Sequence, residues 1–389
     1  MKKLAIITTH PIQYYAPVFQ LLSQRGNIAL KVFYTWGKDA QHKFDPGFGQ
    51  PISWDIPLLN GYSYEWLENT AQKPGSHHFD GINNPDIITR IEAFAPDAIL
   101  VFGWAYQSHL KALRYFKGKV PVLFRGDSVL LAKRNLLFKT LRYFRLRWVY
   151  QYIDHAFYVG SNNKQYFLKY GLKQHQLSFA PHAVDNDRFT QQGDGNNLRQ
   201  ELGIADDAIV ILFAGKLEAV KSPLLLLSTF LKLQQPNIHL IFAGNGGLEP
   251  EMRRMANGLK NVHFLGFKNQ SAMPGIYQAC DLFCLPSLSE TWGLAVNEAM
   301  ACGKAVLVSD KVGCAVDLVI SGKNGEIFRS EDADDLLRWL TKLTKNKELL
   351  AAYGTYSEKT IAPWNFEHIA LAIEKHLNEK IGISETNII

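Results

Sequence analysis

The chain has 389 residues, more than one hydrophobic core usually supports, so its length favours two domains of roughly 150 to 200 residues each. Hydrophobic residues make up 47% of the chain and charged residues 20%, which leaves a disordered or collagen-like protein without support. The net charge of +6 is unevenly spread, because residues 111–150 contain eleven Lys or Arg and one acid, Asp127, and are therefore +10, while the remainder is −4.

The N-terminal segment MKKLAIITTHPIQYY begins with basic residues, but its apolar run stops after about six residues at His10 and Pro11. That run is too short for the core of a signal peptide, and no other stretch approaches the length that spans a bilayer. We therefore expect a cytoplasmic protein.

Short apolar runs with the length of buried strands alternate with helical patterns along the first half. The predicted strands are 4–8, 30–34, 98–102, 120–124 and 156–159, with a predicted helix at 107–116. His10 directly follows the first strand, and Asp127 follows the fourth within Arg-Gly-Asp-Ser. Both should lie at the carboxyl edge of a sheet, facing a cleft, although His10 could equally stabilise a turn.

Residues 37–85 show no clear period but contain several aromatic side chains. They are Phe44, Phe48, Trp54, Tyr62, Tyr64 and Trp66. The segment could form an acceptor-side lid whose rings stack on sugars, or a small packed subdomain.

The basic segment 111–150 ends in KRNLLFKTLRYFRLRWVY, where Leu137, Phe138, Leu141, Phe144 and Trp148 alternate with the charges. Such a pattern is typical of a basic amphipathic helix on an anionic membrane surface, and also of a core helix with a solvated basic face. Nucleic acid is not an expected partner, because no nucleic-acid motif accompanies the charge.

A linker is predicted at 191–200, where Gly, Asp and Asn cluster in QQGDGNNLRQ. Beyond it the strand pattern resumes. The predicted strands are 209–213, 239–242, 262–265, 282–285 and 305–308. Continuous apolar strands between helices indicate parallel sheets covered on both faces, so we expect an α/β protein of two Rossmann-like, doubly wound domains facing each other across a cleft.

Gly215, Lys216 and Lys221 follow strand 209–213, at the carboxyl edge of the second sheet. Two lysines on such a loop can converge on a diphosphate and stabilise the charge that develops on a departing phosphate. Gly244 follows strand 239–242 in a glycine-rich turn, which could approach a ligand or be an ordinary turn, and which lacks the Walker lysine and the GxGxxG pattern.

The segment SETWGLAVNEAM follows strand 282–285 and begins a helix near Trp292, Gly293 and Leu294, beside Thr291. The first turn of a helix can bind a phosphate. Glu290 precedes this helix and Glu298 lies about two turns into it, so the two carboxylates could contact different hydroxyls of one elongated ligand. Alternatively, neither residue binds a ligand: Glu290 is a carboxylate stabilised by the positive end of the helix dipole, and Glu298 is a solvated helical residue. The four cysteines, at spacings that match no zinc or redox pair, are expected to be reduced thiols.

Together these elements resemble the retaining GT-B glycosyltransferases of family four, the glycosyl transferases group 1 type. The resemblance is carried by Gly215-Lys216-Leu217 with Lys221, by PSLSETWGLAVNEAMACGKAV, by GCAVDLVISGKNGEIF and by PHAVDNDRF. Two parts depart from the family pattern: THPIQYYAP replaces its glycine-rich loop after the first strand, and RGDS replaces a frequent His.

The resemblance implies that Lys216 and Lys221 hold a donor diphosphate, that Glu290 contacts the donor sugar and that Glu298 contacts the ribose. It implies transfer with retention of configuration and without a metal or other cofactor. It also implies an acceptor-binding domain at 1–190, a donor-binding domain at 200–364 and a C-terminal helix at about 365–389 that packs back on the first domain.

We therefore expect a metal-independent hexosyltransferase. Its donor would be a UDP or GDP sugar. Its acceptor would be a glycan or lipid-linked glycan in the synthesis of cell-surface polysaccharide or lipopolysaccharide. The enzyme would act in the cytoplasm or at the inner face of the membrane. A nucleotide-sugar epimerase and a non-catalytic nucleotide-sugar-binding protein are the alternatives.

Overall fold

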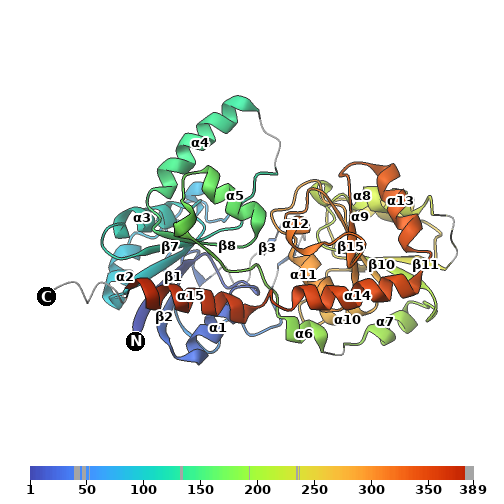
Figure 1. Cartoon of the computed structure of the whole chain (residues 1–389), viewed down its shortest axis with the longest axis horizontal. Coiled ribbons are helices and arrows are strands. Elements are labelled where there is room, and N and C mark those ends of the chain that lie inside the picture. The colour runs from blue at the N-terminus through green and yellow to red at the C-terminus, as the bar shows by residue number, and fades with distance from the viewer. Residues whose placement is uncertain are drawn as a thin grey trace. The chain divides into compact units, whose positions relative to one another are not determined.

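The computed structural model describes residues 1–38, 44–45, 50–51, 53–131, 135–191, 193–233, 235 and 237–381. The chain divides into two compact units (Figure 1). The first unit comprises Met1–Lys43, Pro57–His182 and Phe366–Ile389, and the second comprises Phe44–Ile56 and Ala183–Asn365.

The first unit is built on a seven-stranded sheet in the order β5-β2-β1-β6-β7-β8-β9, and all neighbouring strands pair in parallel. Its strands are β1 Lys2–Thr8, β2 Ile28–Tyr34, β5 Ser63–Trp66, β6 Ala98–Phe102, β7 Val122–Arg125, β8 His155–Tyr158 and β9 Leu177–Phe179. Its helices are α1 Ala16–Arg25, η2 Phe79–Gly81, α2 Ile87–Phe94, α3 Gln107–Phe116, α4 Leu136–Tyr150, α5 Ser161–Lys169, η3 Gln174–Gln176 and α15 Phe366–Ile381.

The second unit has a six-stranded parallel sheet in the order β12-β11-β10-β13-β14-β15. Its strands are β10 Ile209–Ala214, β11 Ile238–Ala243, β12 Val262–Gly266, β13 Leu282–Leu285, β14 Ala305–Ser309 and β15 Gly325–Phe328, with a small antiparallel pair, β3 Phe44–Asp45 and β4 Gln50–Pro51. Its helices are α6 Asn186–Thr190, α7 Gly195–Glu201, η4 Ala219–Lys221, α8 Pro223–Phe230, α9 Glu249–Met255, α10 Met273–Gln278, α11 Leu294–Ala301, α12 Ala315–Leu318, α13 Ala333–Leu343 and α14 Lys347–Ile361.

The central strands form the core of each unit. Every residue of β10 and β14 is buried, as expected for strands covered by helices on both faces. The prediction of two Rossmann-like, doubly wound α/β domains is confirmed. Five strands were missed, because they are short and less uniformly apolar than the central strands: β5, β9, β15 and the two-residue β3 and β4.

The aromatic segment between residues 37 and 85 does not form a free lid in its described part. Tyr62 is buried and its hydroxyl lies 2.6 Å from that of Tyr34 in β2, while Trp66 lies in β5 and packs its ring 4.9 Å from the Tyr34 ring. These rings therefore belong to the edge of the sheet, and the lid interpretation is wrong for them. Trp54 belongs to the second unit, where its ring approaches that of Phe267, and Phe48 lies outside the described residues.

The chain enters the second unit at Ala183, ahead of the linker expected at 191–200, and returns to the first unit at Phe366. There α15 packs against α1, where the Arg25 guanidinium binds the carboxylate of Glu374 at 3.0 Å and also pairs with Glu367. Residues 382–389 of the expected C-terminal helix lie outside the described residues.

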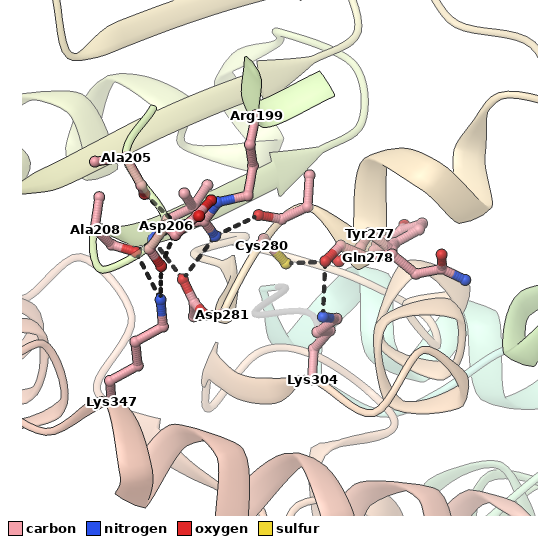
Figure 2. Close-up of polar contacts among 12 residues, drawn as sticks. Arg199, Ala205, Asp206, Ala208, Tyr277, Gln278, Cys280, Asp281, Lys304 and Lys347 are labelled. Atoms are coloured by element: carbon pink, nitrogen blue, oxygen red, sulfur yellow. Dashed lines mark hydrogen bonds and ion pairs between the residues drawn. The ribbon is translucent and has the colours of Figure 1, made fainter. Parts of the chain in front are cut away.

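A buried arginine joins α7 to the second sheet. The Arg199 guanidinium donates to the carbonyls of Ala205, Ala208 and Ala279 and lies 3.4 Å from the Asp281 carboxylate (Figure 2). The same carboxylate accepts a hydrogen bond from the Val210 backbone N–H at 2.8 Å. One guanidinium thus donates to three backbone carbonyls outside the strands, and buried backbone groups require such partners.

The cysteines are free thiols, as expected. Cys280 donates to the Tyr277 carbonyl (Figure 2), and burial raises the pKa of its thiol to about 12. Among the described residues, no helix combines the length and the apolar character needed to cross a membrane.

Replacing Arg199 by methionine should lower the free energy of unfolding by about 3 kcal/mol, because it removes hydrogen bonds to buried carbonyls and the cation that faces the Asp281 carboxylate. Urea unfolding of the full chain measures this. The matched control is Arg254→Met, since Arg254 is exposed on α9. Equal effects of the two substitutions would contradict the role given to Arg199.

Candidate active site

The strand order of the second sheet reverses between β10 and β13, because β10 pairs with the next strand, β11, on one side and with β13 on the other. Ligands of open α/β sheets bind at such a switch point, outside the carboxyl ends of the strands. The loops after β10 and β13 carry Lys216, Lys221 and Glu290.

The loop after β10 lies directly on the glycine turn after β11. Gly215 and Leu217 donate backbone hydrogen bonds to the carbonyls of Ala243 and Asn245, both at 2.9 Å. Gly244 has φ +132°, and a Cβ there would stand 2.0 Å from the Gly215 oxygen. The glycine therefore permits close contact between two backbones, and this contact positions the loop that bears Lys216.

Lys221 and Glu290 form an ion pair between their Nζ and Oε2 atoms, with side chains only 24% and 16% exposed. The two loops are also joined by a backbone hydrogen bond of 2.8 Å from Leu288 to the Val220 carbonyl. Lys216 is half-buried five residues before Lys221 on the same loop. The structure thus brings Lys221 and Glu290 together at the edge where the sequence placed both.

The segment after β14 also supports the loop between β13 and α11. The Glu290 N–H donates to the Lys311 carbonyl, and the N–H groups of Gly313 and Cys314 donate to the carbonyls of Glu290 and Trp292. A Cβ on Gly313 would stand 1.9 Å from the Thr291 oxygen, so this position requires glycine. Sequence reasoning missed Gly313, although it begins the GCAVD stretch.

Gly293, at φ +99°, caps α11, which begins at Leu294. Thr291 is exposed, whereas the Trp292 ring is buried. Its Nε1 donates to Asn297 Oδ1 at 2.9 Å, and its ring lies 5.3 Å from that of Trp364. The observed contacts of Trp292 hold the helix start in place.

Glu298 is not the solvated residue that one interpretation of the sequence gave. It is the fifth residue of α11, hence about one turn into the helix rather than two, and it is only 4% exposed. Its Oε2 accepts a hydrogen bond of 2.7 Å from the Tyr277 hydroxyl of α10. Tyr277 is therefore a further candidate for orienting this carboxylate, which no sequence motif indicated.

The first sheet has its own switch point, between β1 and β6. A pocket of about 250 Å³ opens there, lined by residues that follow β1, β6 and β7, among them Thr9, Tyr15, Trp104, Tyr106 and Asp127. Asp127 thus lies where the sequence predicted it. The neighbouring His10 contacts Thr9 Oγ1 at 2.9 Å through Nδ1 and packs edge-on against Trp36.

The floor of this pocket contains a buried cation that sequence reasoning passed over. Arg125 donates to the carbonyls of Ala180 and Pro181 at 2.8 and 2.7 Å, and burial lowers the pKa of its guanidinium to about 10. Burial, and then the charge of Asp127, raise the pKa of Tyr15, so this phenol stays protonated. The polar groups at the pocket therefore include the Asp127 side chain and the neutral phenol of Tyr15, beside an arginine whose guanidinium is bound to backbone carbonyls.

Two buried histidines stand behind the pocket. His109 Nδ1 donates to the Gly103 carbonyl at 2.9 Å and its Nε2 lies 2.8 Å from Thr35 Oγ1, while the His182 ring is stacked with that of Tyr15. Burial lowers the pKa of His109 to about 4, and burial with the charge of Arg125 lowers that of His182 to about 3. Both rings are neutral at pH 7.

No group of three or more His, Cys, Asp or Glu side chains in the described part of the chain is arranged to hold a metal ion.

Residues 194–360, which contain the loops after β10, β11 and β13, match the family model for glycosyl transferases group 1. The chain is 32% identical over 197 residues to a D-inositol 3-phosphate glycosyltransferase of Geodermatophilus obscurus, covering 47% of this chain and 43% of that protein. It is 26% identical over 238 residues to the lipopolysaccharide 1,2-N-acetylglucosaminetransferase of Salmonella typhimurium, covering 58% of this chain and 62% of that protein. The chain thus spans about half the length of these curated relatives.

The fold of the whole chain resembles that of GT-B glycosyltransferases. The crystal structure of HepE from Anabaena in complex with UDP and glucose superposes with a TM-score of 0.71 at 17% identity, covering 97% of this chain and all of that one.

Gly244→Ala should displace the lysine loop, because its Cβ would overlap the Gly215 carbonyl and its φ would be strained. We expect a loss of about 3 kcal/mol of stability and faster hydrogen exchange at the Leu217 and Leu248 amides. Gly247→Ala is the matched control, since no atom lies within 4 Å of a Cβ there. If both substitutions left exchange unchanged, the close backbone contact would not be what positions the loop.

Stability should fall as the pH drops below 6.5. The folded pKa values of His109 and His182 lie below the ordinary value of 6.5, so the unfolded chain binds protons that the folded chain rejects. Each ring should remove up to about 3 kcal/mol between pH 7 and pH 4. Urea unfolding across this range should show a shallower pH dependence for His109→Gln/His182→Gln than for the unchanged protein. The exposed His175→Gln should leave the slope as it is, and equal slopes for all three proteins would refute the assignment.

Proposed function

We propose that this chain, whose residues 194–360 belong to the glycosyl transferases group 1 family, transfers a sugar from a nucleotide-diphosphate sugar to a glycan or lipid-linked acceptor. The observation that carries the proposal is the Lys221–Glu290 ion pair at the switch point of the second sheet, inside the segment that matches the family.

The donor would bind at the carboxyl ends of β10 and β13. Lys216 and Lys221 would hold its diphosphate, together with the N–H groups at the start of α11, which carry the positive end of the helix dipole. Cations in this place stabilise the charge on the departing nucleoside diphosphate and so do the work that a metal ion does in other transferases. We infer from this that transfer is metal-independent.

The carboxylates would select the donor through its hydroxyls. Glu290, already oriented by Lys221, would accept hydrogen bonds from the donor sugar, and Glu298, oriented by Tyr277, from the ribose. The bond between the anomeric carbon and the diphosphate oxygen then breaks as the acceptor oxygen bonds to that carbon on the same face, and the acceptor hydroxyl proton passes to the departing diphosphate oxygen, with retention of configuration. HepE, solved with UDP and glucose, supports a UDP-type donor, and a GDP sugar is the other candidate.

The acceptor would bind in the first unit, in the pocket lined by Asp127, Tyr15 and Trp104. The Asp127 carboxylate can accept a hydrogen bond from an acceptor hydroxyl, and the aromatic rings offer faces for a sugar. His10, held by Thr9 and Trp36 beside this pocket, would position the loop after β1. The similarity to a lipopolysaccharide N-acetylglucosaminetransferase supports a hexosyl donor and a role in cell-surface polysaccharide synthesis, which we propose takes place on the cytoplasmic side.

Lys221→Met and Glu290→Gln should each lower kcat/KM for sugar transfer by about 10²- to 10³-fold, because the diphosphate charge and the sugar hydroxyls lose their partners. The assay incubates a panel of UDP and GDP sugars with a membrane-glycan extract and follows nucleotide release and the glycan mass. Lys260→Met, which removes an exposed lysine elsewhere in the second unit, should keep full activity.

Three results would overturn the proposal. Unchanged rates for both site variants would show that the pair does not act on the donor. A new sugar epimer formed without an acceptor would indicate an epimerase, and saturable nucleotide-sugar binding without turnover on any acceptor would indicate a binding protein. Inversion of the anomeric centre in the product, read by NMR, would refute retention alone.

A further inference from the structure

Helix α4 presents an apolar stripe to solvent. Its side chains Leu137, Leu141, Phe144 and Trp148 are 72%, 63%, 66% and 42% exposed, and their spacing of four, three and four residues places them on one helical face. Phe138, 43% exposed, extends the stripe at the start of the helix. Five of the sixteen exposed large apolar side chains among the described residues thus lie on this one helix.

This stripe is not the face that α4 packs against its own unit. Leu146, Val149 and Tyr150 belong to the hydrophobic core of the first unit and are almost fully buried. They lie near the end of the helix, and its N-terminal half extends beyond α3 and α5 (Figure 1). The helix is therefore apolar on two sides. The interpretation of its apolar residues as a core face holds for Leu146, Val149 and Tyr150, but not for the stripe.

Cations flank the stripe. Arg145 and Arg147 are exposed on either side of the stripe, whereas Lys139 and the half-buried Arg142 line the pocket beside α5, and the helix contains no acidic residue. The guanidinium of Arg114, from α3, lies 5.6 Å from the Trp148 ring centroid, which places a further cation at the stripe. Within the described residues, no carboxylate forms an ion pair with any of the four α4 cations.

A pocket of about 400 Å³ adjoins the stripe between α4 and α5, lined by Lys139, Arg142 and Lys169 together with Tyr143, Phe144 and Tyr166. Arg142 NH2 donates to the Tyr166 hydroxyl at 2.8 Å, which fixes the guanidinium at the pocket wall. The pocket therefore offers cations with aromatic walls, a combination that suits an anionic headgroup attached to an apolar chain.

We propose that α4 docks this protein on an anionic bilayer surface. The stripe enters the boundary between headgroups and acyl chains, as interfacial amphipathic helices do, and Arg114, Arg145 and Arg147 contact lipid phosphates. The charge complementarity argues for this occupant, because a second copy of the chain would set the same +10 segment against itself. Nucleic acid would match the cations but would leave Leu137, Leu141 and Phe144 in water.

The docking surface lies on the first unit and does not depend on the proposed sugar transfer. It adds to that proposal a place for the reaction, at the surface where a lipid-linked acceptor would be found.

The test is co-sedimentation of the full chain with phosphatidylcholine vesicles, with or without about one third phosphatidylglycerol. The unchanged protein should sediment with the anionic vesicles and release in high salt. Arg114→Glu/Arg147→Glu, which spares Arg145 because that guanidinium lies 5.3 Å from the Trp104 ring of the candidate acceptor pocket, should weaken binding at least about 30-fold, and Leu141→Ser/Phe144→Ser at least about tenfold. The matched controls Arg254→Glu/Lys260→Glu and Met255→Ser/Leu259→Ser change exposed residues of the second unit and should bind like the unchanged protein.

A second readout reports insertion of the stripe. Brominated lipids should quench part of the tryptophan fluorescence, and Trp148→Phe should remove that part while leaving sedimentation nearly intact. Equal binding to neutral vesicles, or equal loss in the second-unit controls, would overturn the proposal. So would salt-sensitive binding that ignores the Leu141→Ser/Phe144→Ser change, because it would point to a purely charged partner. Transfer to a soluble acceptor by Arg114→Glu/Arg147→Glu separates this test from that of the sugar-transfer proposal, since docking variants should retain it.

Discussion

Contact between backbones at the carboxyl edge of the second sheet determines where the charged side chains of the candidate site can stand. The loop bearing Lys216 and Lys221 lies on the turn at Gly244, and the loop bearing Glu290 is held by Gly313. Both contacts require a residue without a Cβ, and they hold the loops so that Lys221 and Glu290 meet as an ion pair. The charges are therefore arranged before any ligand binds, which is the condition under which electrostatic stabilisation costs no reorganisation.

The same ion pair shapes how a diphosphate would be received. An ammonium group that is largely removed from water needs an opposite charge, and Glu290 supplies it in the structure without ligand. A bound diphosphate would offer the lysine more negative charge than the carboxylate does, leaving Glu290 positioned and able to accept hydrogen bonds from hydroxyls. In the proposed reaction the pair would therefore link recognition of phosphate to recognition of sugar.

Much of the fold could be predicted because the central strands are buried on both faces and therefore read as continuous apolar runs. Strands 98–102 and 282–285 and helix 107–116 agree with β6, β13 and α3 at both ends. The polar edge strand β5 gave no such run, and its existence depends on pairing with β2. The assignment of residues 44–56 to the second unit rests on long-range contacts, such as those of Asp55 with Asn269 and Ser271, which no local pattern encodes.

The candidate site was predictable where it follows from the local strand pattern, and unpredictable where it depends on contacts between residues distant in sequence. Loops after neighbouring parallel strands must meet at one edge, so their lysines and glutamate could be placed without coordinates. Gly313, Arg125 and Tyr277 could not be predicted, because each acts on a backbone or carboxylate distant in sequence.

Helix α4 shows most clearly what the sequence pattern cannot predict: its sequence is apolar on two sides, and periodicity alone cannot tell which side packs inward. Once Leu146 and Val149 are seen to fill the core, the stripe of Leu137, Leu141 and Phe144 is left in water beside cations, and this combination of apolar side chains and positive charge is the observation on which the proposed bilayer docking rests.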